Sequence, residues 1–305
     1  MKKNLKMSAA ILAAVMVMGS LTACGGSSSD PTTAAAKDTT AAAADSGSTA
    51  AADSGSATGD VTADVQKIID AGVLKVGVKT DVPCFSLQNT ATGEYEGLED
   101  DLAYNIAGKI FGCTPDEAKE KKLVEFQGVT AKTRGPLVEN GELDMVIATF
   151  TITEERKETY NFSTPYFTDA VGLLVLKDSG IKSIEDLDGK VIGVAQGSTS
   201  QKGFETYIAE KGIDVKPTFE EFDGYPALAA ALSAKNIDVF SVDRAILAGY
   251  RDDTNMLLDD RYAEQDYGVC TKKENTGLAE LVDGVVTDLK DSGKLAEMIK
   301  EWGIE

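Results

Sequence analysis

The chain has 305 residues, with 50 Asp and Glu against 30 Lys and Arg, a formal net charge of −20, and no histidine. An acidic surface repels phosphate groups, so we expect no nucleic-acid partner. The lack of histidine excludes Ser-His-Asp and Cys-His catalysis and histidine-ligated metal sites. The sequence also contains no Walker loop and no G-x-G-x-x-G motif. We therefore expect no enzymatic activity, no cofactor and no metal.

The N-terminus has the pattern of a secretory signal. Three lysines in the first six residues precede an uncharged apolar run at 11–18, and LTAC follows at 21–24. The apolar run is too short to span a bilayer as a stable helix. Small residues before a cysteine at this spacing resemble the bacterial lipobox, which implies a signal peptide over 1–23 and lipidation of Cys24. The alternative is a plain signal peptide with an incidental cysteine.

The next segment, residues 24–60, is predicted to be a disordered tether behind the lipidated Cys24. It contains no aromatic residue and consists almost only of Ala, Ser, Thr, Gly and Asp. Such a composition cannot bury enough apolar surface to offset the entropy of ordering the chain. A multiply acylated cysteine anchors a protein stably, so we expect the protein outside the cytoplasm, anchored to the bacterial cell membrane.

The following residues alternate between strand and helix patterns. In chain order we predict a helix over 65–71, a strand over 74–79, a helix over 99–111, a strand over 123–126, a helix over 133–140 and a buried strand over 145–148. This order is typical of a parallel sheet in an α/β lobe.

The same order begins again in the second half. We predict a strand over 171–176, a short helix starting at 183–186, a strand over 191–195, a helix over 198–211, an extended segment over 216–222, a helix over 226–235, a strand over 239–242 and two helices within 278–302. Two α/β lobes in one chain predict a cleft between them, where small ligands usually bind.

Two segments have the chemistry of an anion site. The sequence GSTS at 197–200 joins a predicted strand to a predicted helix, whose first N–H groups could bind an anion; the alternative is an ordinary helix cap. Arg156 lies in the first turn of a helix, where the helix dipole disfavours a cation. An anionic ligand would explain it; the alternative is a solvated arginine beside Glu154 and Glu155.

Several motifs in register resemble family 3 solute-binding proteins, the polar amino-acid receptors of bacterial ABC importers. They are TFTITEER at 149–156, NFSTPYF at 161–167, DLDGK at 186–190, GST at 197–199 and EGLEDDLA at 96–103. Leu98 stands where the family more often has Phe. The resemblance covers nearly all of residues 61–303. It implies an α/β fold of the type II periplasmic-binding-protein kind, with two lobes, a ligand cleft and two hinge segments.

The motifs KTDVP at 79–83, AKTRGP at 131–136 and SVD at 241–243 are most similar to those of aspartate/glutamate-binding lipoproteins. The resemblance implies that Arg156 binds the ligand α-carboxylate and Asp243 the α-ammonium. The residues implied to assist at these two groups are Thr149, Thr151, Ser198 and Thr199.

The same resemblance implies that Lys79 and Arg134 face the ligand's side-chain carboxylate, with Tyr225 as a hydroxyl donor and Phe85 as an apolar wall. Cys84 and Phe85 stand where those relatives tend to have His and Tyr. Three cations against one carboxylate leave an excess that favours an acidic ligand, because an unpaired buried cation is costly. Glutamine remains the alternative ligand.

The family fold implies one lobe over 61–168 plus 267–305 and a second over 169–266, crossed near 167–170 and 264–268. Ligand contacts to both lobes would close this hinge. The implied partners are a free amino acid, an ABC permease and its separate ATPase subunit, with a monomeric receptor. Two rival hypotheses are a cyclohexadienyl dehydratase-like enzyme on the same fold and an adhesion role for the tether.

Overall fold

The computed structural model describes residues 61–304. The predicted signal peptide, the predicted lipidation site Cys24 and the predicted tether lie outside these residues. Within the described part, no helix is both long and apolar enough to cross a membrane.

The first sheet has the strand order β5-β1-β6-β14-β7. Strand β1 (Leu74–Val78) pairs in parallel with β5 (Val124–Gly128) and β6 (Met145–Val146). The sheet continues with β14 (Cys270–Lys272), which is antiparallel to β6 and to β7 (Tyr160–Phe162). A strand from the C-terminal part of the chain therefore completes the N-terminal sheet.

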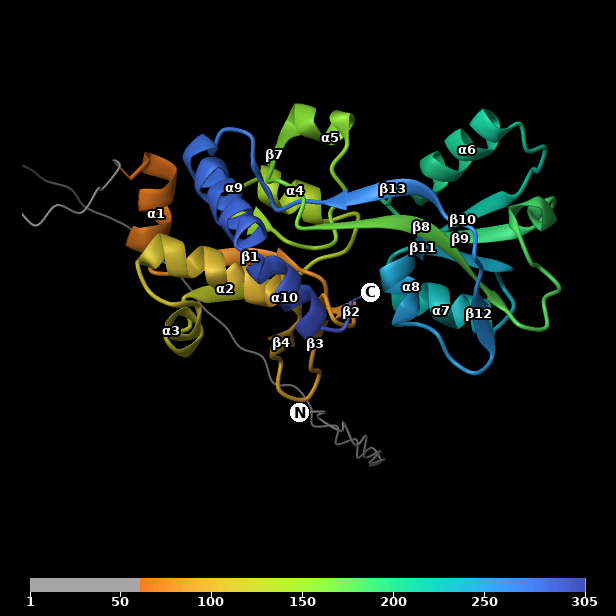
Figure 1. The fold of residues 1–305 in the computed structure, drawn as a ribbon, viewed down its shortest axis with the longest axis horizontal. Coiled ribbons are helices and arrows are strands. Elements are labelled where there is room, and N and C mark those ends of the chain that lie inside the picture. The colour runs from red at the N-terminus through yellow and green to blue at the C-terminus, as the bar shows by residue number, and fades with distance from the viewer. Residues whose placement is uncertain (1–60, 305) are drawn as a thin grey trace, which may run out of the picture. The chain divides into compact units, whose positions relative to one another are not determined.

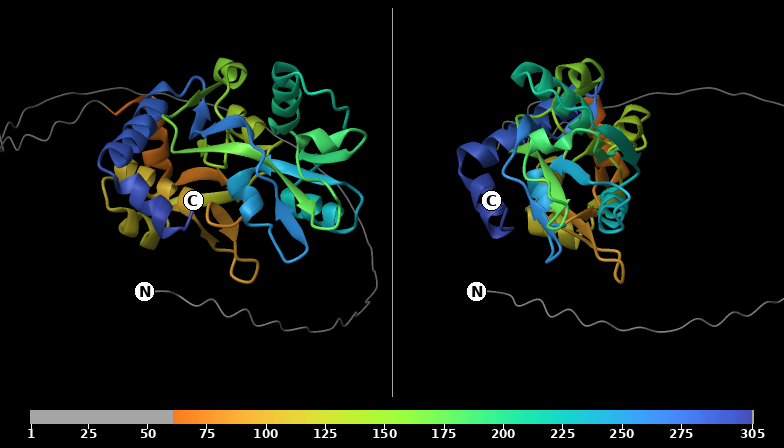
Figure 2. Two further views of the ribbon diagram at one scale, coloured as in Figure 1. Left: turned by 45° about the vertical axis from the view of Figure 1, so that its right-hand side comes forward. Right: turned by 90° about the vertical axis from the view of Figure 1, so that its right-hand side faces the viewer.

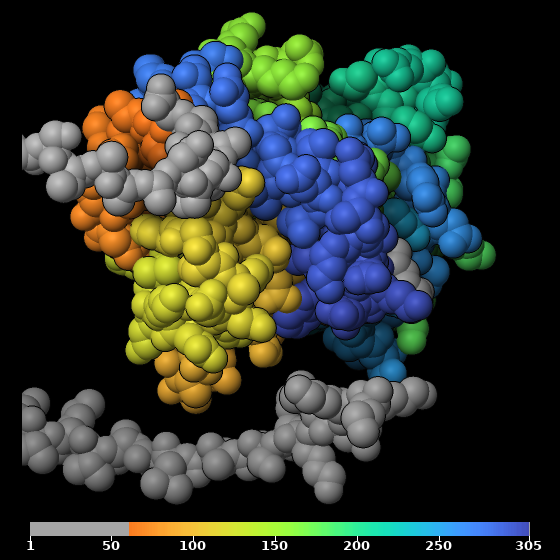
Figure 3. All heavy atoms as spheres, turned by 60° about the vertical axis from the view of Figure 1, so that its left-hand side comes forward, coloured from red at the N-terminus to blue at the C-terminus, as the bar shows by residue number. Residues whose placement is uncertain are grey.

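Helices pack around this sheet, and a three-stranded sheet lies beside it. Helix α9 contacts both α1 and α2, and Figure 3 shows the C-terminal helices covering one face of this lobe. The small sheet has the order β2-β3-β4. The helices are α1 (Ala63–Ala71), α2 (Leu98–Phe111), α3 (Pro115–Glu120), α4 (Arg134–Glu139), α9 (Thr276–Asp291) and α10 (Lys294–Glu301), and the strands are β2 (Asp81–Val82), β3 (Ser86–Gln88) and β4 (Tyr95–Glu96).

The second sheet has the order β10-β9-β11-β8-β12, with β13 paired to β8. Strand β9 is parallel to β10 and β11, whereas β8 is antiparallel to β11, β12 and β13. The strands are β8 (Phe167–Leu176), β9 (Val191–Ala195), β10 (Thr218–Phe222), β11 (Val239–Asp243), β12 (Asn255–Leu257) and β13 (Tyr262–Tyr267). The helices on this side of the chain are η1 (Ile184–Leu187), α6 (Ser200–Lys211), α7 (Tyr225–Ser233) and α8 (Arg244–Ala248), while the short α5 (Glu154–Thr159) precedes β7.

Two neighbouring strands, β8 and β13, connect the two lobes (Figures 1 and 2). Their pairing runs from Tyr267, which lies opposite Phe167, to Glu264, which lies opposite Ala170. Strand β8 leaves the first lobe at Phe167 and runs into the second sheet, and β13 returns to the first lobe just before β14. The expected two-lobed α/β fold with two crossing segments is confirmed.

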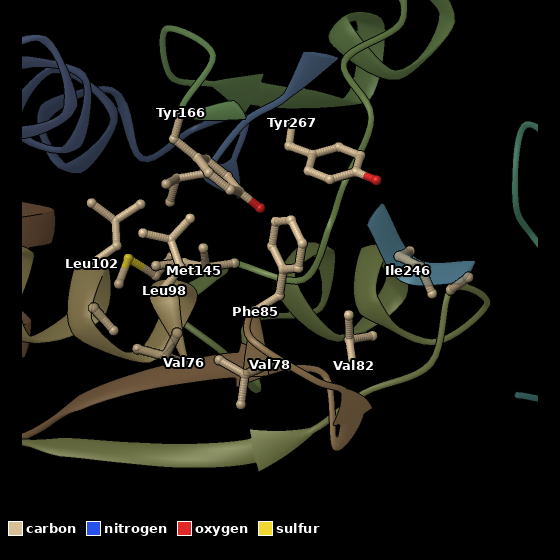
Figure 4. Packing of buried hydrophobic residues seen from close by; sticks show 14 of the residues in the cluster. Val76, Val78, Val82, Phe85, Leu98, Leu102, Met145, Tyr166, Ile246 and Tyr267 are labelled. Carbon is tan, nitrogen blue, oxygen red and sulfur yellow. The ribbon is translucent and has the colours of Figure 1, made fainter. Parts of the chain in front are cut away.

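Aromatic residues fill the core where the lobes meet. Phe85 is 1% exposed and packs edge-on against Phe167 and Tyr267, with ring centroids 5.2 and 6.0 Å away. Figure 4 shows Phe85 pointing toward the rings of Tyr166 and Tyr267, with the side chains of α2 and β1 below them. The crossing strands are thus packed into the core of the first lobe.

The predicted long elements are present with shifted ends. The helix predicted over 198–211 begins at Ser200, and the strand predicted over 145–148 ends at Val146. Strand β13, the helices α3 and α8, and the strands of two or three residues other than β6 were not predicted. The shortest of these segments show no periodicity.

Candidate functional site

The residues predicted to bind ligand follow the ends of strands at the contact between the two lobes. Lys79 comes directly after β1, Thr149 shortly after β6, and Asp243 is the last residue of β11. Residues 197–199 lie between β9 and α6. Ligands bind at such carboxyl ends of parallel strands because loops and helix N-termini gather there.

Two arginines of the first lobe meet around one aromatic ring. Arg134 is 3% exposed and its Nη1 donates to the carbonyl oxygens of Ala148 and Thr149 at 2.5 and 2.9 Å. The guanidinium carbons of Arg134 and Arg156 lie 4.2 and 4.6 Å from the centroid of Phe150. Burial, and secondly the charge of Arg134, lower the pKa of Arg156 to about 9. Two cations this close, one buried and one half-buried, favour a compensating anion between them.

Asp243 brings a carboxylate to these arginines from the second lobe. It is 6% exposed, and the hydroxyl of Tyr267 donates to its Oδ2 at 2.5 Å. Burial raises the pKa of Asp243 to about 7, while Arg134 and Arg156 act to lower it. Asp243 therefore lies within electrostatic reach of both arginines.

Lys79 has a carboxylate partner that the sequence analysis did not assign. It is 1% exposed; its Nζ lies 3.2 Å from Oδ1 of Asp81 and 4.4 Å from the centroid of the Tyr225 ring. Burial lowers the pKa of Lys79, and Asp81 opposes this. The charge balance predicted from the sequence counted Lys79 as unpaired, which is wrong. The signal was present, because Asp81 lies within the KTDVP motif itself.

Two further residues, Gln265 and Glu99, form hydrogen bonds with the predicted threonines. The hydroxyls of Thr151 and Thr199 both donate to Oε1 of Gln265, at 2.6 and 2.7 Å, so this residue of β13 connects both sides of the site. Thr149 has a positive φ of 45°, and its amide donates to Oε1 of Glu99 at 2.6 Å. Neither Gln265 nor Glu99 was predicted as a site residue.

The segment before α6 is built differently from an ordinary cap. Thr199 is the N-cap residue, but its side chain makes no capping hydrogen bond and turns to Gln265 instead. Ser198 accepts only a long bond, 3.4 Å, from the amide of Ser200. The first N–H groups of α6 are therefore not capped by Thr199, as the ordinary-cap alternative would require.

The predicted residues fall into two adjoining sets. Thr151, Arg156, Ser198 and Thr199 line a cavity of about 750 Å³ between α5 and α6. The others are buried next to them and do not line this cavity; they are Lys79, Phe85, Arg134, Thr149, Tyr225 and Asp243. The proximity of Arg134 and Arg156 around Phe150 makes the two sets continuous.

The two lobes touch across the site. Nη2 of Arg156 donates to the carbonyl of Gly197 at 3.1 Å, and Lys202 forms an exposed ion pair with Glu155 at 2.8 Å. On the other side, the Tyr250 hydroxyl donates to the carbonyl of Asp81 at 2.6 Å. These bonds describe a closed arrangement of the two lobes.

Four polar atoms inside this closed arrangement lack hydrogen-bond partners among the described residues. They are Nε of Arg134, the hydroxyl of Thr149, Oε2 of Glu99 and Oδ1 of Asp81, all buried. A buried polar group without a hydrogen-bond partner costs about 1–3 kcal/mol. The site therefore offers both donors and acceptors to a small polar ligand.

Residues 74–305 match the family model of bacterial extracellular solute-binding proteins, family 3. The chain belongs to this family. Among its relatives, the ABC transporter glutamine-binding protein GlnH of Bacillus subtilis is 36% identical over 238 residues, covering 77% of this chain and 82% of GlnH. The glutamine-binding protein of Geobacillus stearothermophilus is 36% identical and covers 87% and 92%. The glutamate-binding protein GluB of Corynebacterium glutamicum is 29% identical and covers 76% and 79%.

Solved structures of family 3 members have the same fold. A mutant of the arginine-binding protein from T. maritima superposes with a TM-score of 0.67 at 27% identity, covering 79% of this chain and all of that one. An ancestral amino-acid-binding protein, described as a precursor of cyclohexadienyl dehydratase, gives 0.66 at 26% identity and covers 79% and 100%. The family 3 fold has therefore been seen both in receptors and in the ancestry of an enzyme.

Proposed function

We propose that this protein is the amino-acid receptor of a bacterial ABC importer. The observation that carries the proposal is the electrostatic interaction of two arginines of one lobe, the buried Arg134 and the half-buried Arg156, with a buried carboxylate of the other lobe, Asp243. An amino acid presents the complementary pair, a carboxylate and an ammonium group. Charge-assisted hydrogen bonds to such groups are the strong ones, and an arginine can bind a carboxylate bidentately.

The proposed roles follow from chemistry and position. Arg156 lines the cavity together with Thr151 and Thr199, which suits the α-carboxylate common to all amino acids. Asp243 receives the α-ammonium, and Thr149 assists there. Ser198 belongs to the same turn and is proposed as a further contact to the α-carboxylate.

We propose an acidic side chain on the ligand, aspartate or glutamate. Lys79 and Asp81 cancel one another, so Arg134 and Arg156 exceed Asp243 by one positive charge. A zwitterion with an additional carboxylate carries one negative charge and balances the site. In this arrangement Arg134 and Lys79 face the side-chain carboxylate, with the Tyr225 hydroxyl as a donor and Phe85 as the apolar wall.

Glutamine is the second candidate, and Glu99 is the observation that favours it. Burial raises the pKa of Glu99 to about 7, with Arg134 among the charges that oppose this rise. If Glu99 is ionised in the bound state, the site is already neutral and suits a side-chain amide. The names of the two relatives at 36% identity favour the same ligand.

The remaining parts of the proposal concern the whole receptor. Ligand contacts to both lobes, residues 61–168 plus 267–305 and residues 169–266, would hold the hinge closed. The closed monomer would deliver its ligand to a permease with a separate ATPase subunit. Lipidated Cys24 would keep the receptor at the outer side of the cell membrane, where its tether lets it reach the permease.

A dehydratase-like reaction is the alternative within the same fold, and the enzyme-precursor neighbour is the reason to test it. It would need a positioned general acid or base. Asp243 is the candidate, but its carboxylate accepts a hydrogen bond from Tyr267, and the charges of Arg134 and Arg156 lower its pKa, which suits an ammonium partner. Incubation with a cyclohexadienyl substrate would reveal such a reaction by product formation.

Calorimetric titration against aspartate, glutamate and glutamine tests the proposal. Binding of aspartate or glutamate more tightly than glutamine would support the acidic ligand. Binding of glutamine alone would retain the receptor and reject the acidic ligand. No binding of any amino acid would reject the proposed function.

Three variants then test the orientation of the ligand. Arg156→Ala should weaken all three amino acids, because each carries the α-carboxylate. Arg134→Ala should weaken the acidic ligands about ten- to a hundredfold, the effect of one charged hydrogen bond, and affect glutamine little. Lys79→Met should also weaken the acidic ligands, because it removes a cation and leaves the Asp81 carboxylate unpaired. If Arg134→Ala weakens all ligands equally and Arg156→Ala is selective, the ligand lies the other way round.

A further inference from the structure

Tyr267 contacts the proposed ammonium site, although no sequence motif singled it out. It is fully buried at the end of β13, the crossing strand that returns to the first lobe. Its hydroxyl donates to Oδ2 of Asp243 at 2.5 Å, a short bond to a buried carboxylate of the second lobe. One residue of a crossing segment thus holds the only carboxylate that we assign to ligand binding.

The backbone of Tyr267 is fixed on three sides. It pairs with Phe167 on the neighbouring crossing strand and bridges to Thr151, which lines the cavity. Its carbonyl accepts a hydrogen bond from the amide of Tyr166 at 2.9 Å. The position of its side chain is therefore set by the same segments that form the site.

The ring of Tyr267 is enclosed as well. Its centroid lies 5.9 Å from that of Phe167, 6.0 Å from that of Phe85 and 6.1 Å from that of Tyr166. Figure 4 shows its hydroxyl extending beyond these rings, away from Tyr166. A ring packed in this way cannot turn its hydroxyl from Asp243 without disturbing the core.

We propose that Tyr267 is a positioning residue for ligand binding, which aims the Asp243 carboxylate and keeps it ionised to receive the ligand ammonium. The inference rests on the proposed function. In this arrangement one carboxylate oxygen of Asp243 accepts a hydrogen bond from Tyr267, and the other is left to bind the ligand ammonium.

The charges around Asp243 determine how loss of the Tyr267 hydrogen bond would change its pKa. Burial raises the pKa of Asp243 to about 7; the hydrogen bond from Tyr267 lowers it, Asp169 raises it, and both nearby arginines lower it. Loss of the Tyr267 bond should therefore leave more of Asp243 protonated at neutral pH. A protonated Asp243 cannot pair with an ammonium group. The titratable and charged groups that face it from neighbouring elements are Asp169, Arg134, Arg156, Tyr225, Tyr262 and Tyr267.

Tyr262→Phe is the matched control for Tyr267→Phe. Tyr262 lies on the same strand and is equally buried, but its hydroxyl bonds to the neutral hydroxyl of Ser241 at 2.7 Å. Both changes remove one buried hydroxyl from β13. Only the change at Tyr267 removes a donor from Asp243, so a general loss of packing would affect both variants alike.

The first measurement needs no ligand. Carbon-13 NMR titration of the aspartate carboxyl groups in the full chain, with Asp243→Asn for assignment, gives the titration midpoint of Asp243. Tyr267→Phe should raise this midpoint by about one to two pH units, the effect of one charged hydrogen bond. Incorporation of 3,5-difluorotyrosine at position 267, a more acidic donor of nearly the same shape, should lower it.

The second measurement is the dissociation constant for glutamate between about pH 5.5 and 8.5. In the wild-type protein, affinity should fall about tenfold per pH unit below the Asp243 midpoint, since protonation and binding compete. In Tyr267→Phe the same decline should begin about one to two units higher, and Tyr262→Phe should follow the wild type.

The outcomes separate the two proposals. If the wild type binds amino acids but Tyr267→Phe has an unchanged carboxyl midpoint or an unchanged pH profile, the role of Tyr267 is wrong and the proposed function stands. If Tyr262→Phe shifts as much as Tyr267→Phe, the effect is one of packing and the role is again wrong. If the wild type binds no amino acid while the carboxyl midpoint shifts as expected, the proposed function fails and Tyr267 has no ligand to position.

Discussion

Three buried carboxyl groups dominate the chemistry of this protein at the scale of single residues. Burial raises the pKa of Glu99 to about 7, of Asp100 to about 8 and of Asp243 to about 7. Unfolded carboxyl groups release their protons near pH 4. The folded state thus binds more protons between these values, so the free energy of unfolding should fall as the pH rises through this interval, by about 1.4 kcal/mol per pH unit for each group.

Asp100→Asn should remove one of these contributions. Asp100 is 1% exposed, accepts a hydrogen bond from Ser86 at 2.9 Å, and has a second oxygen without a partner. The neutral amide avoids burial of a charge, so the variant should lose less stability than the wild type between pH 5 and pH 8. Urea unfolding at several pH values measures this, with the exposed Asp259→Asn as control. Parallel curves for wild type and variant would contradict the assignment.

Asp243→Asn should abolish the binding of every amino acid, because it removes the anion proposed for the ammonium group. Breaking a buried ion pair costs about 3–5 kcal/mol, which is more than a hundredfold in affinity. Calorimetry on the variant and on Asp259→Asn gives the comparison. Binding within tenfold of the wild type would remove Asp243 from the site.

At the scale of elements, the start of α2 connects the small sheet to the site. The amides of Leu98 and Glu99 donate to the carbonyls of Cys84 and Phe85, each at 2.9 Å, so the helix begins against this loop. Glu99 then reaches Thr149, 50 residues further along the chain. Glycine at position 97 is what allows such a close approach: a Cβ there would lie 1.9 Å from the carbonyl oxygen of Phe85.

Gly97→Ala should therefore destabilise the protein by about 3 kcal/mol or more, at the upper end of overpacking effects, because backbone atoms must move. Gly284→Ala is the control: it lies exposed within α9, and nothing is within 4 Å of an added Cβ. That change should stabilise the protein by up to about 1 kcal/mol through helix propensity. Denaturant unfolding of both variants measures the difference; equal midpoints would contradict the packing argument.

At the scale of the whole molecule, the site is divided between two lobes that, within residues 61–304, two crossing strands connect. Two hydrogen bonds cross the division: Arg156 donates to the carbonyl of Gly197, and the Tyr250 hydroxyl donates to the carbonyl of Asp81. A ligand that contacts both lobes adds to these bonds only in the closed form. Ligand binding should therefore raise the free energy of unfolding of the entire two-lobed unit.

Aspartate or glutamate should raise the melting temperature of the protein in a concentration-dependent way. A ligand that binds only the folded state stabilises by about 4 kcal/mol at a thousandfold excess over its dissociation constant. Thermal unfolding with each amino acid in turn measures the shift, with arginine as a charge-mismatched comparison. A larger shift with arginine than with the acidic amino acids would contradict the proposed charge balance.

The sequence by itself determined the features that depend on local spacing. The alternation of strand and helix patterns predicted the α/β class, and the helix over 65–71 ends as expected at Gly72, which adopts a φ of 72°. The buried strand β1 follows from its apolar run. Such features depend on residues only a few positions apart, so one sequence suffices to predict them.

Only the tertiary structure decided which side chains become partners. Gln265 joins Thr151 to Thr199, and Tyr267 holds Asp243. These three hydrogen bonds span 114, 66 and 24 residues of chain. Such pairings depend on strand register and on how the lobes close, and neither leaves a periodic trace in the sequence. The sequence therefore identifies the charged residues, but only the fold shows which of them are buried and which groups they pair with.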